Sequence, residues 1–244
     1  MHRNKRGIVS RCRQYWSELT YEMTTNMAGN IAIATVIGYV FGSLPAAYLV
    51  ARLRKRIDIR DVGSRNMGAM NVFYQVGPAE AALVTLADLG KGIGAILLMR
   101  YVLGGNLISP FDFLTGLTAT AAILGHIFPV FVRFRGGKGA ATAIGVLIFL
   151  MPWALPFLFV FFGIALLISR NPTFSYALLL IVFPFVAGFV YVDYYDAPLS
   201  LVFYSTGLGV FLGIQYIPRL KEMHSKAGGD WRKVVRRSSL IERF

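Results

Sequence analysis

The chain has 244 residues, 56% of them hydrophobic, and 25 Lys and Arg against 12 Asp and Glu give a formal net charge of +13. The mean hydropathy is +0.58, and several apolar runs approach the ~20 residues that cross a bilayer, so a soluble globular domain is excluded. The single cysteine, Cys12, excludes an internal disulfide and a cysteine-based metal site.

Continuous apolar runs predict an all-α, polytopic transmembrane helical bundle with about seven spans, because the alternating pattern of a β-barrel is missing. The runs cover residues 28–51, 79–103, 111–132, 139–151, 153–169, 174–192 and 198–217. Pro152 separates the fourth run from the fifth, which predicts a tight hairpin of two short spans. Merging these two runs gives six spans instead.

The basic residues predict the orientation of the bundle, residues 28–218. They gather after the first and third runs and in the tail, residues 219–244. The positive-inside rule then places the loops at 52–78 and 133–139, together with the tail, on the cytoplasmic face. Because these charges lie beside spans, anionic membrane lipids and phosphorylated substrates are the expected partners, and nucleic acid is not.

The basic leader, residues 1–27, contradicts this orientation, since its Lys and Arg side chains would have to cross the membrane. A misassigned start, with Met23 or Met27 as the initiator, is the preferred explanation. A cytoplasmic N-terminal tail with a different topology is the alternative. A cleaved signal peptide fits poorly, because the leader has no apolar region and cleavage site distinct from the first run.

Three segments carry polar chemistry. The loop 57–72 offers Ser64, Asn66 and Asn71 to a small polar ligand, although a plain turn that caps a helix has the same composition. Asp88 and Lys91 lie three residues apart on one helix face, where an ion pair is expected. Attraction of a substrate phosphate by Lys91 is the alternative role, with Asp88 orienting it.

The third segment, residues 125–142, places Gly136, Gly137 and Gly139 beside the basic residues Arg135 and Lys138, between apolar runs. Glycines let backbone N–H groups converge on an anion, and Gly137 is expected to adopt a positive φ. A flexible loop that only fixes topology is the alternative. His126, at the membrane end of the third run, is either an acid/base group or a structural histidine that holds this loop.

Taken in order, these segments resemble the acyl-phosphate-dependent glycerol-3-phosphate acyltransferase family of bacterial plasma membranes. The resemblance is carried by Gly-Ser-Leu-Pro-Ala-Ala-Tyr at 42–48, Asp-Ile-Arg at 58–60, Gly-Ser-x-Asn-x-Gly-Ala-x-Asn at 63–71, Asp-x-x-Lys-Gly at 88–92, and Gly-His-x-Phe-Pro with Gly-Gly-Lys-Gly at 125–139. It is close over residues 40–145 and rests on hydropathy elsewhere.

The resemblance implies transfer of a fatty acyl group from acyl phosphate to glycerol 3-phosphate, which makes lysophosphatidate for phospholipid biosynthesis. It implies no cofactor, no metal ion and no acyl-carrier protein, and it places the enzyme in the bacterial plasma membrane with its active-site loops in the cytoplasm. Ser64, His126 and Lys138 are the candidate catalytic residues. The candidate substrate-binding and phosphate-binding residues are Asn66, Asn71, Asp88, Lys91, Arg135, Gly136, Gly137 and Gly139.

The chain departs from the family pattern in two motifs. In the first loop, Arg65 stands where the pattern has its second glycine, and Tyr74 stands where it has an arginine. After the last span, Gly213 and Tyr216 replace a histidine and an asparagine, and Ser225 replaces a glutamate. An active acyltransferase with a rearranged acceptor site is the leading hypothesis. A catalytically silent paralogue that binds lipid phosphate and a transporter are the alternatives.

Overall fold

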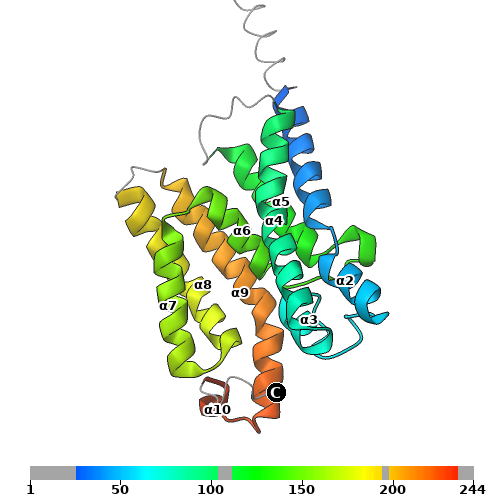
Figure 1. Cartoon of the computed structure of the whole chain (residues 1–244). Helices are drawn as coiled ribbons and strands as arrows, with labels where there is room; N and C mark the ends of the chain where they lie inside the picture. Colours follow the sequence, from blue (N-terminus) through cyan, green and yellow to red (C-terminus); the bar gives the residue numbers. More distant parts are fainter. Residues whose placement is uncertain (1–25, 104–111, 194–197, 236–244) are drawn as a thin grey trace, which may run out of the picture.

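The computed structural model describes residues 26–103, 112–193 and 198–235, and this part of the chain contains helices and no strands, as predicted. A helix over residues 26–42 comes first (Figure 1). The following elements are α2 (Ala46–Lys55), α3 (Ala69–Gln75), α4 (Pro78–Val102), α5 (Phe113–Ile127), η1 (Val130–Val132), α6 (Ala140–Leu150), α7 (Ala154–Ser169), α8 (Pro172–Ala187), η2 (Gly188–Asp193), α9 (Ser200–Lys226) and α10 (Trp231–Val235).

Five helical segments in the described residues are long and apolar enough to cross a bilayer, which confirms a multi-pass membrane bundle. They are Asn26–Lys55, Pro78–Val102, Phe113–Val132, Pro172–Val192 and Ser200–Lys226. The shorter apolar helices α6 and α7 occupy the other two predicted runs, so seven complete spans remain a prediction. Large apolar side chains such as Leu86, Leu167 and Phe185 are exposed on the outside of the bundle, as contact with lipid requires.

The first long segment is broken at residues 43–45, between the first helix and α2. Pro45 has no N–H to donate to the carbonyl of Phe41, which accepts a long 3.4 Å bond from the N–H of Leu44. The hydroxyl of Ser43 adds a second hydrogen bond to the carbonyl of Tyr39, at 2.7 Å. The helix therefore ends there, and α2 continues as a separate element that carries the basic residues following the first span (Figure 1).

The predicted break at Pro152 is confirmed, because α6 ends at Leu150 and α7 begins at Ala154. The prediction that the two helices pack together as a tight hairpin is wrong. α6 packs mainly against α4, while α7 packs against α8. Glycine is the reason: a Cβ on Gly145 would overlap the carbonyl of Leu89, and a Cβ on Gly92 would lie 2.6 Å from the carbonyl of Thr142. Only glycines allow α4 and α6 to approach so closely.

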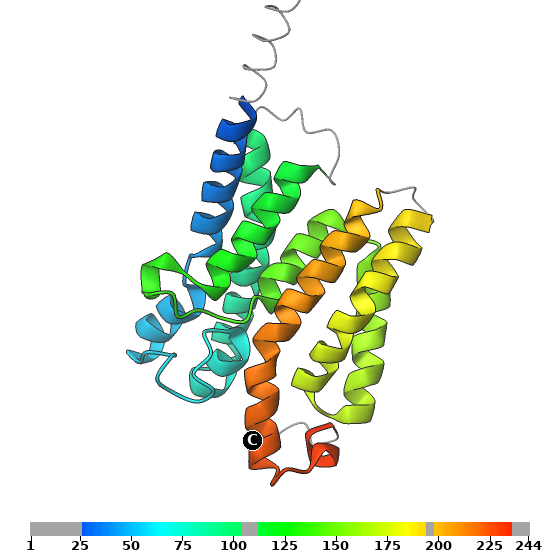
Figure 2. The ribbon, with the colours of Figure 1, turned by 180° about the vertical axis from the view of Figure 1, so that it is seen from behind.

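The first helix meets α5 in the same way. Side chains at Gly38 and Gly42 would collide with the backbone of α5, and a side chain at Gly125 would collide with the first helix near Tyr39. In a lipid environment such small-residue contacts replace the hydrophobic effect as the source of helix association. Figure 1 and Figure 2 show the result, with the first helix, α4 and α5 forming one group, and α7, α8 and α9 forming another.

The loop between α2 and α3, the connection from η1 to α6 and the C-terminal part of α9 lie toward the same end of the bundle (Figures 1 and 2). The charge pattern predicted this grouping. Which side of the membrane this end faces remains a prediction. The predicted leader falls almost entirely outside the described residues, and the predicted tail is described only as far as residue 235.

Candidate active site

One buried amide organises the loop between α2 and α3. Asn71, 2% exposed, donates through Nδ2 to the carbonyls of Ile59, Val62 and Asn66 at 2.9, 3.1 and 3.1 Å, while its Oδ1 accepts from the backbone N–H of Ser64 at 3.0 Å. The side chain was predicted to bind substrate, but its hydrogen-bonding groups face the loop itself. Asn71 therefore gives the loop its shape.

Hydrogen bonds from Arg60 join this loop to the turn that follows α5. Arg60 donates to both carboxylate oxygens of Asp58 at 2.9 and 2.7 Å, and to the carbonyl of Val132 at 2.6 Å. Its guanidinium also lies 5.0 Å from the ring centroid of Tyr48. Hydrogen bonds from Arg60 lower the pKa of Asp58 to about 2, so the carboxylate stays ionised at neutral pH. Sequence reasoning used Asp58 and Arg60 only as part of a motif and missed their fixing role.

The glycine-rich loop folds back on the end of α5. The N–H groups of Gly136 and Gly137 donate to the carbonyls of Ile127 and His126 at 3.2 and 3.1 Å. These two N–H groups were predicted to bind phosphate, but they close a turn instead. The later N–H groups, from Lys138 into the first turn of α6, are the ones that a helix N-terminus leaves for an anion.

Gly137 is required because of close contact, not because of its φ angle. A Cβ there would overlap Nε2 of His126 and lie 2.8 Å from the carbonyl of Met67. The expected positive φ occurs instead at Gly139, the residue before α6, with φ 81°. Through Gly137 the two polar loops touch each other and the ring of His126.

A buried ionic cluster lies beneath this contact. Nζ of Lys91 lies 2.6 Å from Oδ1 of Asp88, and these side chains are 4% and 2% exposed, which confirms the expected pair on one helix face. Nδ1 of His126 lies 3.6 Å from the same oxygen, which is longer than a hydrogen bond. His126 thus stands between the Asp88–Lys91 pair and the glycine-rich loop.

Lys138 turns toward α9. Its Nζ lies 4.6 Å from the centroid of the Tyr216 ring. Burial lowers the pKa of Lys138 to about 8; the charge of Arg219 acts in the same direction, and Glu222 opposes it. The ammonium is therefore still mostly protonated at neutral pH. Nearby in the first turn of α6, the hydroxyl of Thr142 is buried and has no hydrogen-bond partner among the described residues.

The remaining candidates lie on the open side of the loops. Ser64 is exposed and Asn66 is half-buried. Arg135 is exposed and lies 3.9 Å from the carboxylate of Asp61 in the first loop. Arg65, also exposed, has a φ of 56°, the left-handed region that glycine adopts without strain.

The structure thus brings the two loops, His126 and the buried pair together at one end of the bundle. Sequence reasoning missed Met67, whose carbonyl packs against Gly137, because an apolar residue in a polar loop gives no chemical signal. It also treated Tyr216 only as a lost asparagine. Among the described residues, no group of three His, Cys, Asp or Glu side chains could hold a metal ion.

The family model described as glycerol-3-phosphate acyltransferase matches residues 32–226. A glycerol-3-phosphate acyltransferase 2 of Dehalococcoides mccartyi (strain ATCC BAA-2266 / KCTC 15142 / 195) is 42% identical over 215 residues, which cover 88% of this chain and 97% of that protein. A glycerol-3-phosphate acyltransferase of Caulobacter vibrioides (strain NA1000 / CB15N) is 44% identical over 118 residues, 48% of this chain and 52% of that protein.

Two crystal structures of PlsY, an integral membrane glycerol 3-phosphate acyltransferase, share the fold. The glycerol 3-phosphate form has a TM-score of 0.67 and 28% identity, covering 82% of this chain and 94% of that one. The lysophosphatidic acid form has a TM-score of 0.65 and 26% identity, covering 82% and 93%. Since the family model and the Dehalococcoides relative each extend over most of the sequence, the chain belongs to the glycerol-3-phosphate acyltransferase family.

Proposed function

We propose that this chain transfers a fatty acyl group from acyl phosphate to the 1-hydroxyl of glycerol 3-phosphate, releasing lysophosphatidate and inorganic phosphate. The supporting observation is the contact between Met67 and Gly137, which joins a polar loop and a basic glycine-rich loop at one end of an apolar bundle. An apolar acyl chain can then lie among the helices while its phosphate meets the loops.

The reaction needs little covalent help from the protein. The hydroxyl oxygen attacks the acyl carbonyl carbon, the carbon–oxygen bond to phosphate breaks, and phosphate leaves with the bonding electrons. The hydroxyl proton passes to the departing phosphate or to water. Because an acyl phosphate is a mixed anhydride with a good leaving group, positioning two anions and stabilising the developing charge supply most of the acceleration.

The glycine-rich side of the site would hold the donor phosphate. The protonated Lys138, the free N–H groups at the start of α6 and the unpaired hydroxyl of Thr142 point to this role. The exposed Arg135 adds charge at its edge. In this site, the role of Gly136, Gly137 and Gly139 is to shape the loop.

The first loop would hold glycerol 3-phosphate, with Ser64 and Asn66 on its open side and Arg65 supplying a cation. His126 would orient the glycine-rich loop or exchange a proton, since its ring touches Gly137. Asp88 and Lys91 would support His126 from below.

The assay is acyl transfer by the purified protein with acyl phosphate and glycerol 3-phosphate, following lysophosphatidate and released phosphate. Loss of one charged hydrogen bond is worth about 1.5–3 kcal/mol, so Lys138→Ala should lower kcat/KM roughly 10- to 150-fold. Lys55→Ala, on the exposed last turn of α2, is the control and should change little. Unaltered transfer by Lys138→Ala would make the loop a topological anchor only.

The orientation of the site is tested separately. We propose that it faces the cytoplasm of a bacterial cell, because its loops carry the excess of Lys and Arg. In a protein lacking Cys12, a cysteine replacing Ser64 should resist an impermeant thiol reagent on intact cells. A cysteine replacing Trp153 near the opposite end of the bundle should react. The backbone N–H of Trp153 donates to the hydroxyl of Tyr191. The reverse pattern of labelling would place the site outside.

A further inference from the structure

The replacement of an asparagine by Tyr216 in this chain does more than remove an amide. Tyr216 is only 8% exposed, although it lies on α9 nearly three turns from the C-terminal end of the helix. The ammonium of Lys138 lies 4.6 Å from the centroid of its ring, within the range in which an aromatic face attracts a cation.

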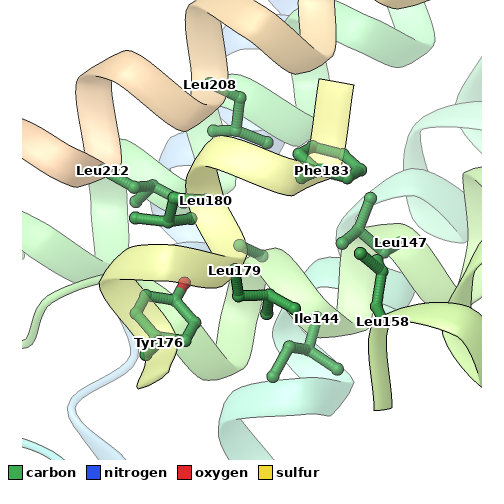
Figure 3. A pocket seen from close by; sticks show the side chains of 10 residues that line it. Ile144, Leu147, Leu158, Tyr176, Leu179, Leu180, Phe183, Leu208 and Leu212 are labelled. Carbon is green, nitrogen blue, oxygen red and sulfur yellow. The ribbon is translucent and has the colours of Figure 1, made fainter. Parts of the chain in front are cut away.

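The ring of Tyr216 is itself held in place. The ring of Tyr176, on α8, lies 4.8 Å from it at an interplanar angle of 36°. Tyr176 also lines a small apolar cavity of about 30 Å³ between α6, α7, α8 and α9. Figure 3 shows Tyr176 at the edge of this cavity, with Leu212 of α9 among the other lining residues. Tyr176 therefore contacts both the ring of Tyr216 and this apolar cavity.

We propose that Tyr216 is a positioning residue for the phosphate site: its ring face holds the Lys138 ammonium at the mouth of the glycine-rich loop, and Tyr176 supports the ring from behind. This role rests on the proposed function only in that the anion held there is the donor phosphate. The contact itself belongs to this chain and accompanies its departure from the family pattern at residue 216.

Geometry favours the ring of Tyr216, over the other groups near Lys138, as the group that holds the ammonium. Arg219 and Glu222, both on α9, act on the lysine with opposite effects. α6 has no charged side chain, and α8 offers only the tyrosine hydroxyl of Tyr176. Without the aromatic face, the buried ammonium would keep the cost of desolvation and lose an attraction that offsets part of it.

The first test does not depend on activity. The rate at which acetic anhydride modifies Lys138 is measured against pH by peptide mass spectrometry on the purified full chain. The midpoint of this pH profile in the wild-type protein should lie near the Lys138 pKa of about 8. Tyr216→Phe keeps the ring face and should keep that midpoint, whereas Tyr216→Leu should lower it by ~0.4–1.5 pH units. Tyr204→Leu removes a partly buried ring elsewhere on α9 and should leave it unchanged.

Two results would overturn the proposal: an unshifted midpoint in Tyr216→Leu, or the same shift in Tyr216→Phe, which would assign the effect to the hydroxyl. If Tyr216→Leu does not fold, Tyr216→Met provides the same comparison with a more adaptable side chain.

The second test uses turnover. Tyr216→Leu should raise KM for acyl phosphate roughly 2- to 30-fold and change KM for glycerol 3-phosphate little, and Tyr216→Phe should restore the wild-type value. An equal rise for both substrates would contradict a role through Lys138. If the wild-type protein shows no acyl transfer, the proposed function fails, and the modification experiment still decides whether Tyr216 holds the lysine.

Discussion

Replacing Asn71 by leucine should destabilise the protein through the first loop. The side chain has two N–H hydrogens for three carbonyls and accepts one further bond, so about three effective hydrogen bonds are lost. At ~0.5–1.5 kcal/mol each, the free energy of unfolding should fall by about 1.5–4.5 kcal/mol. Leucine has a similar volume, so the change removes the hydrogen bonds without opening a large cavity.

The measurement is thermal unfolding of the purified protein in detergent, with acyl transfer measured on the same samples. Asn71→Asp should be at least as destabilising as leucine, because a carboxylate oxygen would then face carbonyl oxygens. Asn66→Ala is the control, since this half-buried side chain should affect KM for glycerol 3-phosphate while stability changes by less than ~0.5 kcal/mol. Wild-type stability in Asn71→Leu together with a raised KM would refute the organising role and restore Asn71 as a substrate ligand.

Three further predictions concern charge, backbone strain and the place of Gly213 on α9. Lys91→Met leaves Asp88 buried without its partner and should cost about 3–5 kcal/mol of stability, much of it recovered by adding Asp88→Asn; equal thermal stability of the single variant and wild type would contradict this. Arg65→Gly relieves a left-handed backbone and should raise stability slightly, by up to ~1 kcal/mol, while increasing KM for glycerol 3-phosphate; an unchanged KM would remove Arg65 from the acceptor site. Gly213 has open space for a side chain one turn before Tyr216, so Gly213→His should fold, and it should raise kcat for acyl transfer ~10-fold or more if an imidazole on this face is needed; no gain in kcat would show that it is not.

Hydropathy predicted the long helices well because lipid demands that each span satisfy its own backbone and present apolar side chains, and both requirements are local in sequence. The partner of α6 is not local. It depends on Gly92 and Gly145 meeting across two helices, and neither glycine indicates its partner. For the same reason the packing of α6 beside α7 was predicted wrongly although the break between them was predicted correctly.

The candidate site also combines features that are local in sequence with features that depend on distant residues. The pairing of Asp88 with Lys91 follows from helical spacing, so it could be predicted. The role of Asn71 could not, since an amide that binds a ligand and an amide that holds a loop have the same residue type and the same neighbours in sequence. Gly137 illustrates a further limit: the need for glycine was recognised, but its cause is the ring of His126 and not the backbone angle.

An active site that works by electrostatic stabilisation must fix its hydrogen-bond donors before substrate arrives, because donors that reorganise during the reaction lose much of their electrostatic effect. In this chain, the groups that hold the two loops in shape and the groups that are exposed to substrate belong to different residues. Asn71, Arg60 and Gly137 direct their polar groups or backbone contacts inward, which ties the two loops to each other and to α5. Ser64 and Arg135 are left exposed on the same loops. Substitutions of the first kind should therefore lower stability and turnover together, whereas substitutions of the second kind should change substrate affinity in a protein of normal stability.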